Sequence, residues 1–203
     1  MMTKGLHDQV LWNDIRQGSE QAFSELYFRY DDILLSYGYT LIKDRELIKD
    51  SIQELFLDIW KRRNTSLVPE KVNRYLLKAF RRLLLRRINQ DKKKLKEKET
   101  TGDITENPEE DHLIAQESEN HQHKYLSQMI STLPNRQREI IYLKYYQGFT
   151  YEEIALIMGI QHEAAWNLLS RAIRKLREQA IDVKHVCVCF SPFCGFSNFF
   201  QIR

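Results

Sequence analysis

One face of a predicted helix near the end of the chain carries side chains suited to contacting nucleic acid. Apolar residues recur at helical spacing after Gly159, which predicts an amphipathic helix. At about 100° per residue, its other side gathers Glu163, Asn167, Ser170, Arg171 and Arg174, with Ala164 at the border. Asn and Arg hydrogen-bond to base edges and phosphates. The alternative is an ordinary solvated face, which most amphipathic helices have.

The elements before this helix would expose its first turns. A short apolar-periodic segment precedes Gly159, so the sequence predicts two helices joined by a tight glycine turn, an arrangement common in DNA-binding proteins. Thr150 and Glu153 have the spacing of a capping box, which predicts that the first helix begins there and gives both residues a structural role. Trp166 lies at the edge of the apolar arc and is expected to pack.

A second candidate surface lies on a helix predicted after Asp44. Its apolar stripe contains Ile48, Ile52, Leu55 and Ile59. Another side combines apolar and acidic groups, namely Asp50, Gln53, Leu57 and Trp60, flanked by Glu54 and Phe56. Leucine and tryptophan beside carboxylates fit a protein–protein contact, or the packing of a neighbouring helix. The pattern leaves these two interpretations open.

A third candidate surface is basic. The helix predicted to contain Leu76, Ala79, Phe80 and Leu83 carries cations on its other side, namely Arg74, Lys78, Arg81 and Arg82, with Tyr75 nearby. Such a face suits a nucleic-acid backbone, and a solvated basic face is the alternative.

Composition favours helices throughout. Of the 203 residues, 42% are hydrophobic and 29% charged, with only 7 glycines and 4 prolines, which predicts an all-α fold. The formal net charge of +3 permits a polyanionic partner. The sequence has no apolar run of membrane-spanning length, and its start lacks a signal-peptide pattern, so we expect a cytoplasmic protein without direct membrane insertion.

Charge and composition predict two small helical domains, 1–95 and 109–182, joined by a flexible acidic linker, 96–108. The second domain ends in the predicted helix-turn-helix. The tail 183–203 differs in composition and contains His185, Cys187, Cys189 and Cys194. Because C-x-C-x4-C is not the usual zinc spacing, no metal site is predicted, and the tail has no assigned role.

From Ala22 to Glu178 the chain resembles the extracytoplasmic-function sigma factors, two-domain members of the bacterial sigma-70 superfamily. The first domain resembles them through D-x-x-Q-E-x-F-x-x-x-W at Asp50, Gln53, Glu54, Phe56 and Trp60. The second does so through LPNRQREIIYLKYYQGFTYEEIALIMGI and the helix that follows.

The resemblance implies promoter-specific transcription initiation by binding, without catalysis or a cofactor. It implies that Asp50, Gln53, Glu54, Phe56, Leu57 and Trp60 dock on core RNA polymerase at the β′ clamp, with the β flap as a further contact. The −10 element would be bound and melted by Arg74, Tyr75, Lys78, Arg81 and Arg82, with a captured base in the loop 64–71. The −35 element would be read by Gln161, His162, Glu163, Ala164, Asn167, Ser170, Arg171 and Arg174. An anti-sigma factor is a further expected partner.

The alternatives to a sigma factor are an operator-binding regulator and an enzyme. An operator-binding helix-turn-helix regulator independent of core polymerase would leave the surface from Asp50 to Trp60 without a purpose. An enzyme would need a nucleophile-and-base pair, a cluster of metal-binding acids or a glycine-rich phosphate loop, and the sequence shows none of these motifs.

Overall fold

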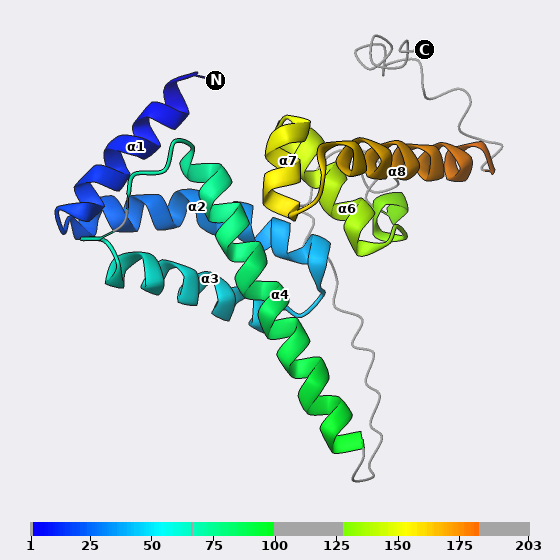
Figure 1. Ribbon diagram of the computed structural model, residues 1–203, viewed down its shortest axis with the longest axis horizontal. Helices are drawn as coiled ribbons and strands as arrows, with labels where there is room; N and C mark the ends of the chain where they lie inside the picture. Colours follow the sequence, from blue (N-terminus) through cyan, green and yellow to red (C-terminus); the bar gives the residue numbers. More distant parts are fainter. Residues whose placement is uncertain (1, 66, 100–127, 183–203) are drawn as a thin grey trace.

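The computed structural model describes residues 2–65, 67–99 and 128–182, and these ranges form helices and no strand (Figure 1). The predicted all-α fold is therefore confirmed. The helices are α1 (Met2–Arg16), α2 (Glu20–Leu41), α3 (Arg45–Lys61), α4 (Val72–Glu99), α6 (Asn135–Ile141), the π-helical segment η1 (Tyr142–Tyr146), α7 (Tyr151–Met158) and α8 (His162–Asp182).

Local sequence explains where several helices begin and end. The side chains of Ser19 and Asp44 accept hydrogen bonds from backbone N–H groups that have no partner within the first turns of α2 and α3. Thr150 and Glu153 form the predicted capping box at the start of α7. Gly159 ends α7 in the left-handed conformation, with φ of 65°, and this sharp turn leads into α8.

The helices α1 to α4 form one group around α2. Side chains of α2 such as Leu26 and Leu34 are fully buried among those of its neighbours. No helix was predicted at 2–16, yet α1 buries Leu11, Trp12 and Ile15 in this core. The burial of these three apolar side chains stabilises α1, although the apolar periodicity of its sequence is weak.

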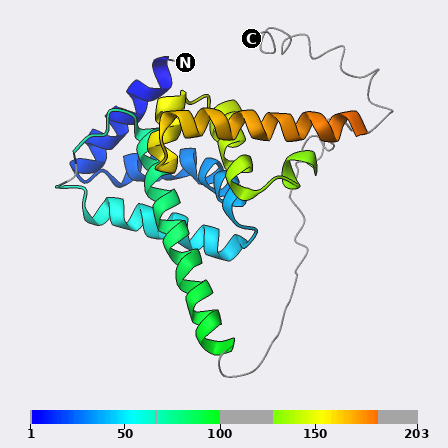
Figure 2. The same cartoon turned by 45° about the vertical axis from the view of Figure 1, so that its right-hand side comes forward.

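The helices α6 to α8 form a second group that packs directly on the first (Figures 1 and 2). In this arrangement α6 contacts α2, and α7 contacts α4. Toward its C-terminal end, α4 extends away from both groups (Figure 1). Helical backbone continues to Glu99, so the range 96–108 predicted as linker begins inside α4. The rest of that range, and the tail with its cysteines, lie outside the described residues.

Close packing of α2 against α3 depends on Gly38. A Cβ atom added there would lie 2.6 Å from Cγ2 of Ile48, a buried residue of α3. We therefore expect Gly38→Ala to lower the free energy of unfolding by about 1–3 kcal/mol, despite the better helix propensity of alanine. Urea unfolding followed by circular dichroism measures this. Ser36→Ala, at an exposed position of the same helix, is the control and should change the value by less than about 0.5 kcal/mol; equal values for the two variants would contradict the packing argument.

Candidate protein and nucleic-acid interfaces

The predicted docking residues of α3 separate into exposed and buried members. Asp50, Gln53 and Leu57 are exposed, and Leu57 presents 54% of its surface. Trp60 is partly buried against Phe23, with ring centroids 5.1 Å apart. We call Asp50, Gln53, Leu57 and Trp60 the α3 surface; it places two apolar side chains among polar ones in reach of a partner.

Two predicted docking residues make contacts within the fold. Phe56 is only 2% exposed and packs edge-on against Phe23 and Tyr27, so it supports the α3 surface from beneath and does not present a contact face. This corrects the expectation for Phe56, whose flanking position in the sequence hid its orientation toward α2. Glu54 accepts hydrogen bonds from Arg86 and Arg87 of α4, which hold α3 and α4 together.

The predicted basic face of α4 consists of Arg74, Tyr75, Lys78, Arg81 and Arg82, and only part of it faces solvent. Lys78 and Arg82 are exposed and form no ion pair with other described residues. Tyr75 is partly exposed, with its ring edge-on to Trp12 at 5.2 Å. Arg81 is mostly buried, with 13% of its side chain exposed, because it pairs with a carboxylate of α6. The sequence left open whether Arg81 binds a nucleic-acid backbone or lies on a solvated face; in this structure it pairs with the carboxylate of α6.

The partner of Arg81 is Glu139, a carboxylate that is 1% exposed. One oxygen of Glu139 accepts hydrogen bonds from Arg81 Nε at 2.6 Å and from the Tyr37 hydroxyl at 2.7 Å. Burial, together with the negative charge of Glu139, raises the pKa of Tyr37 well above its ordinary value, so Tyr37 stays a donor. Burial alone would lower the pKa of Arg81, but the bond to Glu139, the charge of Glu139 and the interactions with Tyr37 together outweigh it and the pKa rises. The cluster joins α2, α4 and α6.

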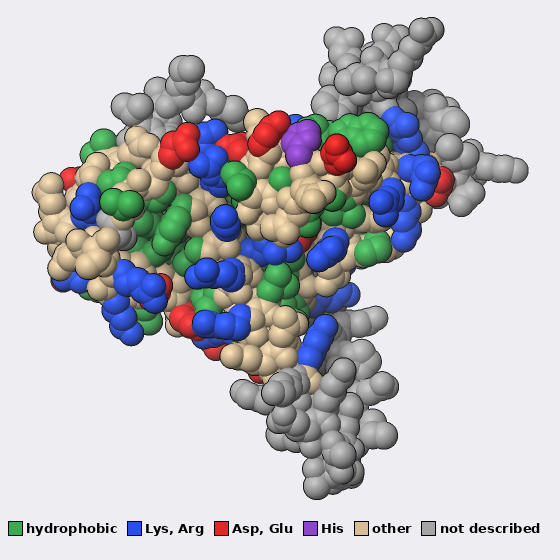
Figure 3. Space-filling view, viewed as in Figure 1, with side chains coloured by type: hydrophobic (Ala, Val, Ile, Leu, Met, Phe, Trp, Pro, Cys, Tyr) green, Lys and Arg blue, Asp and Glu red, His purple; other side chains and the backbone are tan. Residues whose placement is uncertain are grey.

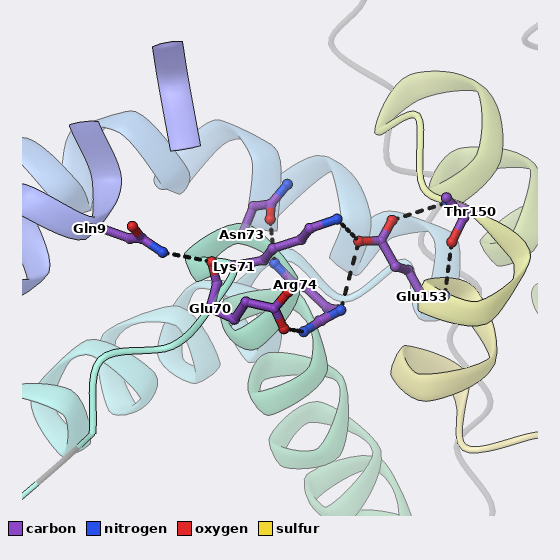
Figure 4. A network of polar contacts seen from close by, with 7 residues as sticks. All are labelled: Gln9, Glu70, Lys71, Asn73, Arg74, Thr150 and Glu153. Atoms are coloured by element: carbon purple, nitrogen blue, oxygen red, sulfur yellow. Dashed lines mark hydrogen bonds and ion pairs between the residues drawn. The ribbon is translucent and has the colours of Figure 1, made fainter. Parts of the chain in front are cut away.

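A second carboxylate, Glu153, makes a similar junction between α7 and the start of α4 (Figure 4). Its Oε1 lies 2.5 Å from Nζ of Lys71 and 3.8 Å from Arg74. Its Oε2 accepts the backbone N–H of Thr150 as part of the capping box. Glu153 was expected to act only in starting α7; the structure adds an ion-pairing role with Lys71 and Arg74.

Burial alone would raise the pKa of Glu153, but the bonds from Lys71 and Thr150 and the nearby charges outweigh it and hold the pKa below its ordinary value of 4.5. A carboxylate with a depressed pKa in the folded state contributes stability above the pKa of the unfolded state, and that contribution is lost as the pH falls through the folded-state value. We therefore expect wild type to exceed Glu153→Gln in free energy of unfolding at neutral pH, and the difference to shrink below pH 4.5.

Parallel denaturant titrations across acidic pH test this. In a Lys71→Met background, which lacks the closest cation, the pH dependence of the difference should be weaker. A difference that grows on acidification would contradict the assignment.

On α8 the predicted polar face is exposed along its length. The exposed residues are Gln161, His162, Glu163, Ala164, Asn167, Ser170, Arg171 and Arg174. We call them the α8 polar face. The outward orientation of six of these eight side chains follows from the 3.6-residue period of the helix. The other two, Gln161 and His162, lie at the turn, and their positions depend on Gly159 ending α7.

The sequence reading missed two features of this region. Arg136 of α6 lies beside the α8 polar face and lines a shallow pocket of about 370 Å³ with Gln161, Asn167 and Arg171. Arg136 lies in α6, which η1 and α7 separate from the glycine turn, so no local pattern placed it beside α8. Trp166 was expected to pack, but 55% of its surface is exposed, because its position at the edge of the apolar arc turns the ring outward.

A groove of about 660 Å³ lies between parts of α4 and α7, beside the contact between these helices. Lys78, Arg82 and Arg86 line one side, and Leu156 and Ile157 line the other. Lys and Arg side chains gather across the middle of the face drawn in Figure 3, where α4 runs. The described residues thus present positive charge next to the contact between the two helical groups.

Neither a metal site nor a membrane span is found in the part of the chain that the structure describes. Its His, Cys, Asp and Glu side chains form no group of three or more suited to hold a metal ion. None of its helices combines the length and apolarity needed to cross a membrane.

Comparison with known proteins shows which family the chain resembles. Residues 123–176 match the family model described as Sigma-70, region 4. Over 172 residues the chain is 22% identical to the ECF RNA polymerase sigma factor SigK of Mycolicibacterium vanbaalenii, covering 83% of this chain and 87% of that protein. The chain is therefore similar to the extracytoplasmic-function sigma factors, and its match to region 4 supports a role in transcription initiation and DNA binding.

Two solved structures share the fold. The sigma factor RpoE of Bartonella quintana, solved with the anti-sigma factor NepR, aligns with a TM-score of 0.62 at 18% identity, over 80% of this chain and 98% of that one. CnrH, solved with the cytosolic domain of CnrY, aligns with a TM-score of 0.58 at 16% identity, over 88% of this chain and 99% of that one. The all-helical fold of this chain is therefore shared with both solved structures.

Proposed function

We propose that this protein is a sigma factor that directs promoter-specific initiation by binding core RNA polymerase through α3 and promoter DNA through α4 and α8. The observation that carries the proposal is the pairing of two exposed faces with different chemistry on one chain. The α3 surface combines Leu57 and Trp60 with polar groups, as protein interfaces do. The α8 polar face offers Asn167 and Arg171, which suit base edges and phosphates.

Each contact is assigned to a set of residues. The β′ clamp of core polymerase is contacted by Asp50, Gln53, Leu57 and Trp60, with Glu54 and Phe56 supporting them, and the β flap is a further contact. The separated strand of the −10 element is held by Arg74, Tyr75, Lys78, Arg81 and Arg82. The −35 element is read in the major groove by the α8 polar face, with Arg136 as an added phosphate contact.

Domain boundaries follow the same division. Residues 1–95 form the docking and melting domain, 96–108 the linker, and 109–182 the −35 domain. Hydrogen bonds cross the contact between the two helical groups, and water can replace them if the domains separate during function.

An anti-sigma factor is the proposed regulator. The two structural relatives with the same fold, RpoE and CnrH, were solved with NepR and with the cytosolic domain of CnrY. A partner of the same kind would act on this chain in the cytoplasm, where polymerase and promoter DNA are found.

Run-off transcription tests the proposal. Purified protein is added to sigma-free core polymerase on a library of promoter fragments. We expect transcripts that start at a fixed distance downstream of two recurring elements. Tight binding to some fragments without polymerase, and no transcript with it, would instead support an operator-binding regulator.

A further inference from the structure

Two carboxylates of the second helical group occupy cations of the α4 basic face. Arg81 is bound by Glu139 through both carboxylate oxygens, at 2.6 and 3.4 Å. Glu153 pairs at 2.5 Å with Lys71, the residue before α4, and lies 3.8 Å from Arg74, which also pairs with Glu70 at 3.1 Å, as Figure 4 shows. Guanidinium and ammonium groups pair with phosphate in the same way as with carboxylate, so a DNA strand and these two glutamates compete for the same donors.

The contact that brings the two glutamates to these cations combines apolar packing with several hydrogen bonds. Between α6 and α2, Asn135 and Arg138 donate to the backbone oxygens of Leu41 and Thr40. Tyr142, in η1, donates to the backbone oxygen of Ile33 and stacks on Tyr37 with ring centroids 5.7 Å apart. Water can replace such hydrogen bonds when the groups part, which is typical of contacts between domains that move relative to each other.

The α3 surface lies outside this contact. Asp50, Gln53 and Leu57 are exposed while Glu139 and Glu153 hold their cations. The α8 polar face is exposed in the same state. Among the three proposed binding faces, only the α4 basic face has side chains, Arg74 and Arg81, that pair with described carboxylates of the other helical group.

We propose that Glu139 and Glu153 form an intramolecular latch that keeps the α4 basic face from binding a single DNA strand until the two helical groups separate. The latch consists of Glu139 with Arg81 and Tyr37, and of Glu153 with Lys71 and Arg74. The closed chain can still engage core polymerase through α3, so docking precedes capture of the −10 strand. The proposal rests on the proposed function for its biological meaning, but the latch can be measured without polymerase.

Opening is measured by the distance between spin labels on the two groups. Lys61→Cys in α3 and Glu178→Cys in α8 are exposed labelling positions, in a full-length chain whose Cys187, Cys189 and Cys194 are replaced by serine. We expect Glu139→Gln to shift the distance distribution toward longer values. Tyr37→Phe removes one hydrogen bond to Glu139 and should shift it less, which gives a milder second variant if Glu139→Gln folds poorly.

Strand binding is measured by fluorescence anisotropy with a labelled single-stranded DNA of mixed sequence. If the closed form predominates, opening should raise the affinity of Glu139→Gln about tenfold, because apparent affinity scales with the competent fraction. Glu20→Gln makes the same charge change at an exposed site and should have little effect. Arg81→Gln should open the chain too, but without the gain in affinity, because it also removes a proposed strand contact.

Unchanged distances in both Glu139→Gln and Tyr37→Phe would overturn the latch, as would opening without a gain in strand affinity for Glu139→Gln. The proposed function fails separately, if wild type gives no run-off transcript while the distance and strand-binding results hold.

Discussion

Replacing Gln53 and Leu57 together by alanine should weaken binding to core RNA polymerase by about 10- to 100-fold, or ~1.4–2.8 kcal/mol. Both side chains are exposed on the α3 surface, and no described residue depends on them for packing in the way that Phe23 depends on Trp60. The loss would therefore reflect the interface and not the fold. Truncating Trp60 would open a space beside Phe23, so its effect would combine binding with stability.

The measurement is a titration of labelled protein with sigma-free core enzyme, with helicity checked by circular dichroism. A matched control is Val10→Ala with Gln128→Ala, which removes one exposed aliphatic side chain and one exposed glutamine, both outside α3. Equal affinities for this control and the α3 double variant would remove the α3 surface from the docking site. A loss confined to the α3 variant would support it.

Features that depend on residues close together in the sequence were predicted, whereas contacts between distant segments were not. The faces of α3 and α8 follow from a 3.6-residue period, and the cap at Thr150 follows from Glu153 three residues away. These local features were found correctly. Periodicity gives the direction of a side chain but not what lies opposite it, which is why Phe56 was taken as a contact residue and Trp166 as a packing one.

The latch could not be predicted from local patterns, because its partners are far apart in the sequence. Arg81 and Glu139 are separated by 58 positions, and Lys71 and Glu153 by 82. One indication was present at Glu139, a single acid followed by Ile140 and Ile141 in a helix that had to bury its apolar side. A carboxylate in such a place needs a cationic or hydrogen-bonding partner, but nothing local identifies which one.

For promoter recognition, the largest loss is expected from Arg171→Ala and Asn167→Ala in α8. The two positions are one helical turn apart, both side chains are exposed, and Arg136 lies beside them in the same shallow pocket. Each contact to a base edge contributes about 1–3 kcal/mol of discrimination, so either substitution should lower promoter affinity of the holoenzyme by about 5- to 150-fold. Lys43→Ala removes a positive charge from an exposed position outside α3, α4 and α8 and controls for charge alone.

Salt and sequence dependence together distinguish the kind of contact that each residue makes. A residue that reads a base should, when replaced by alanine, relax the preference at one position of the −35 element in a promoter library. A residue that binds phosphate should weaken all sequences alike and reduce the slope of log affinity against log salt by about one unit. We expect the first behaviour for Asn167, which has no charge, and the second for Arg136. An Asn167→Ala protein with unaltered promoter preference and affinity would place the reading surface elsewhere on α8.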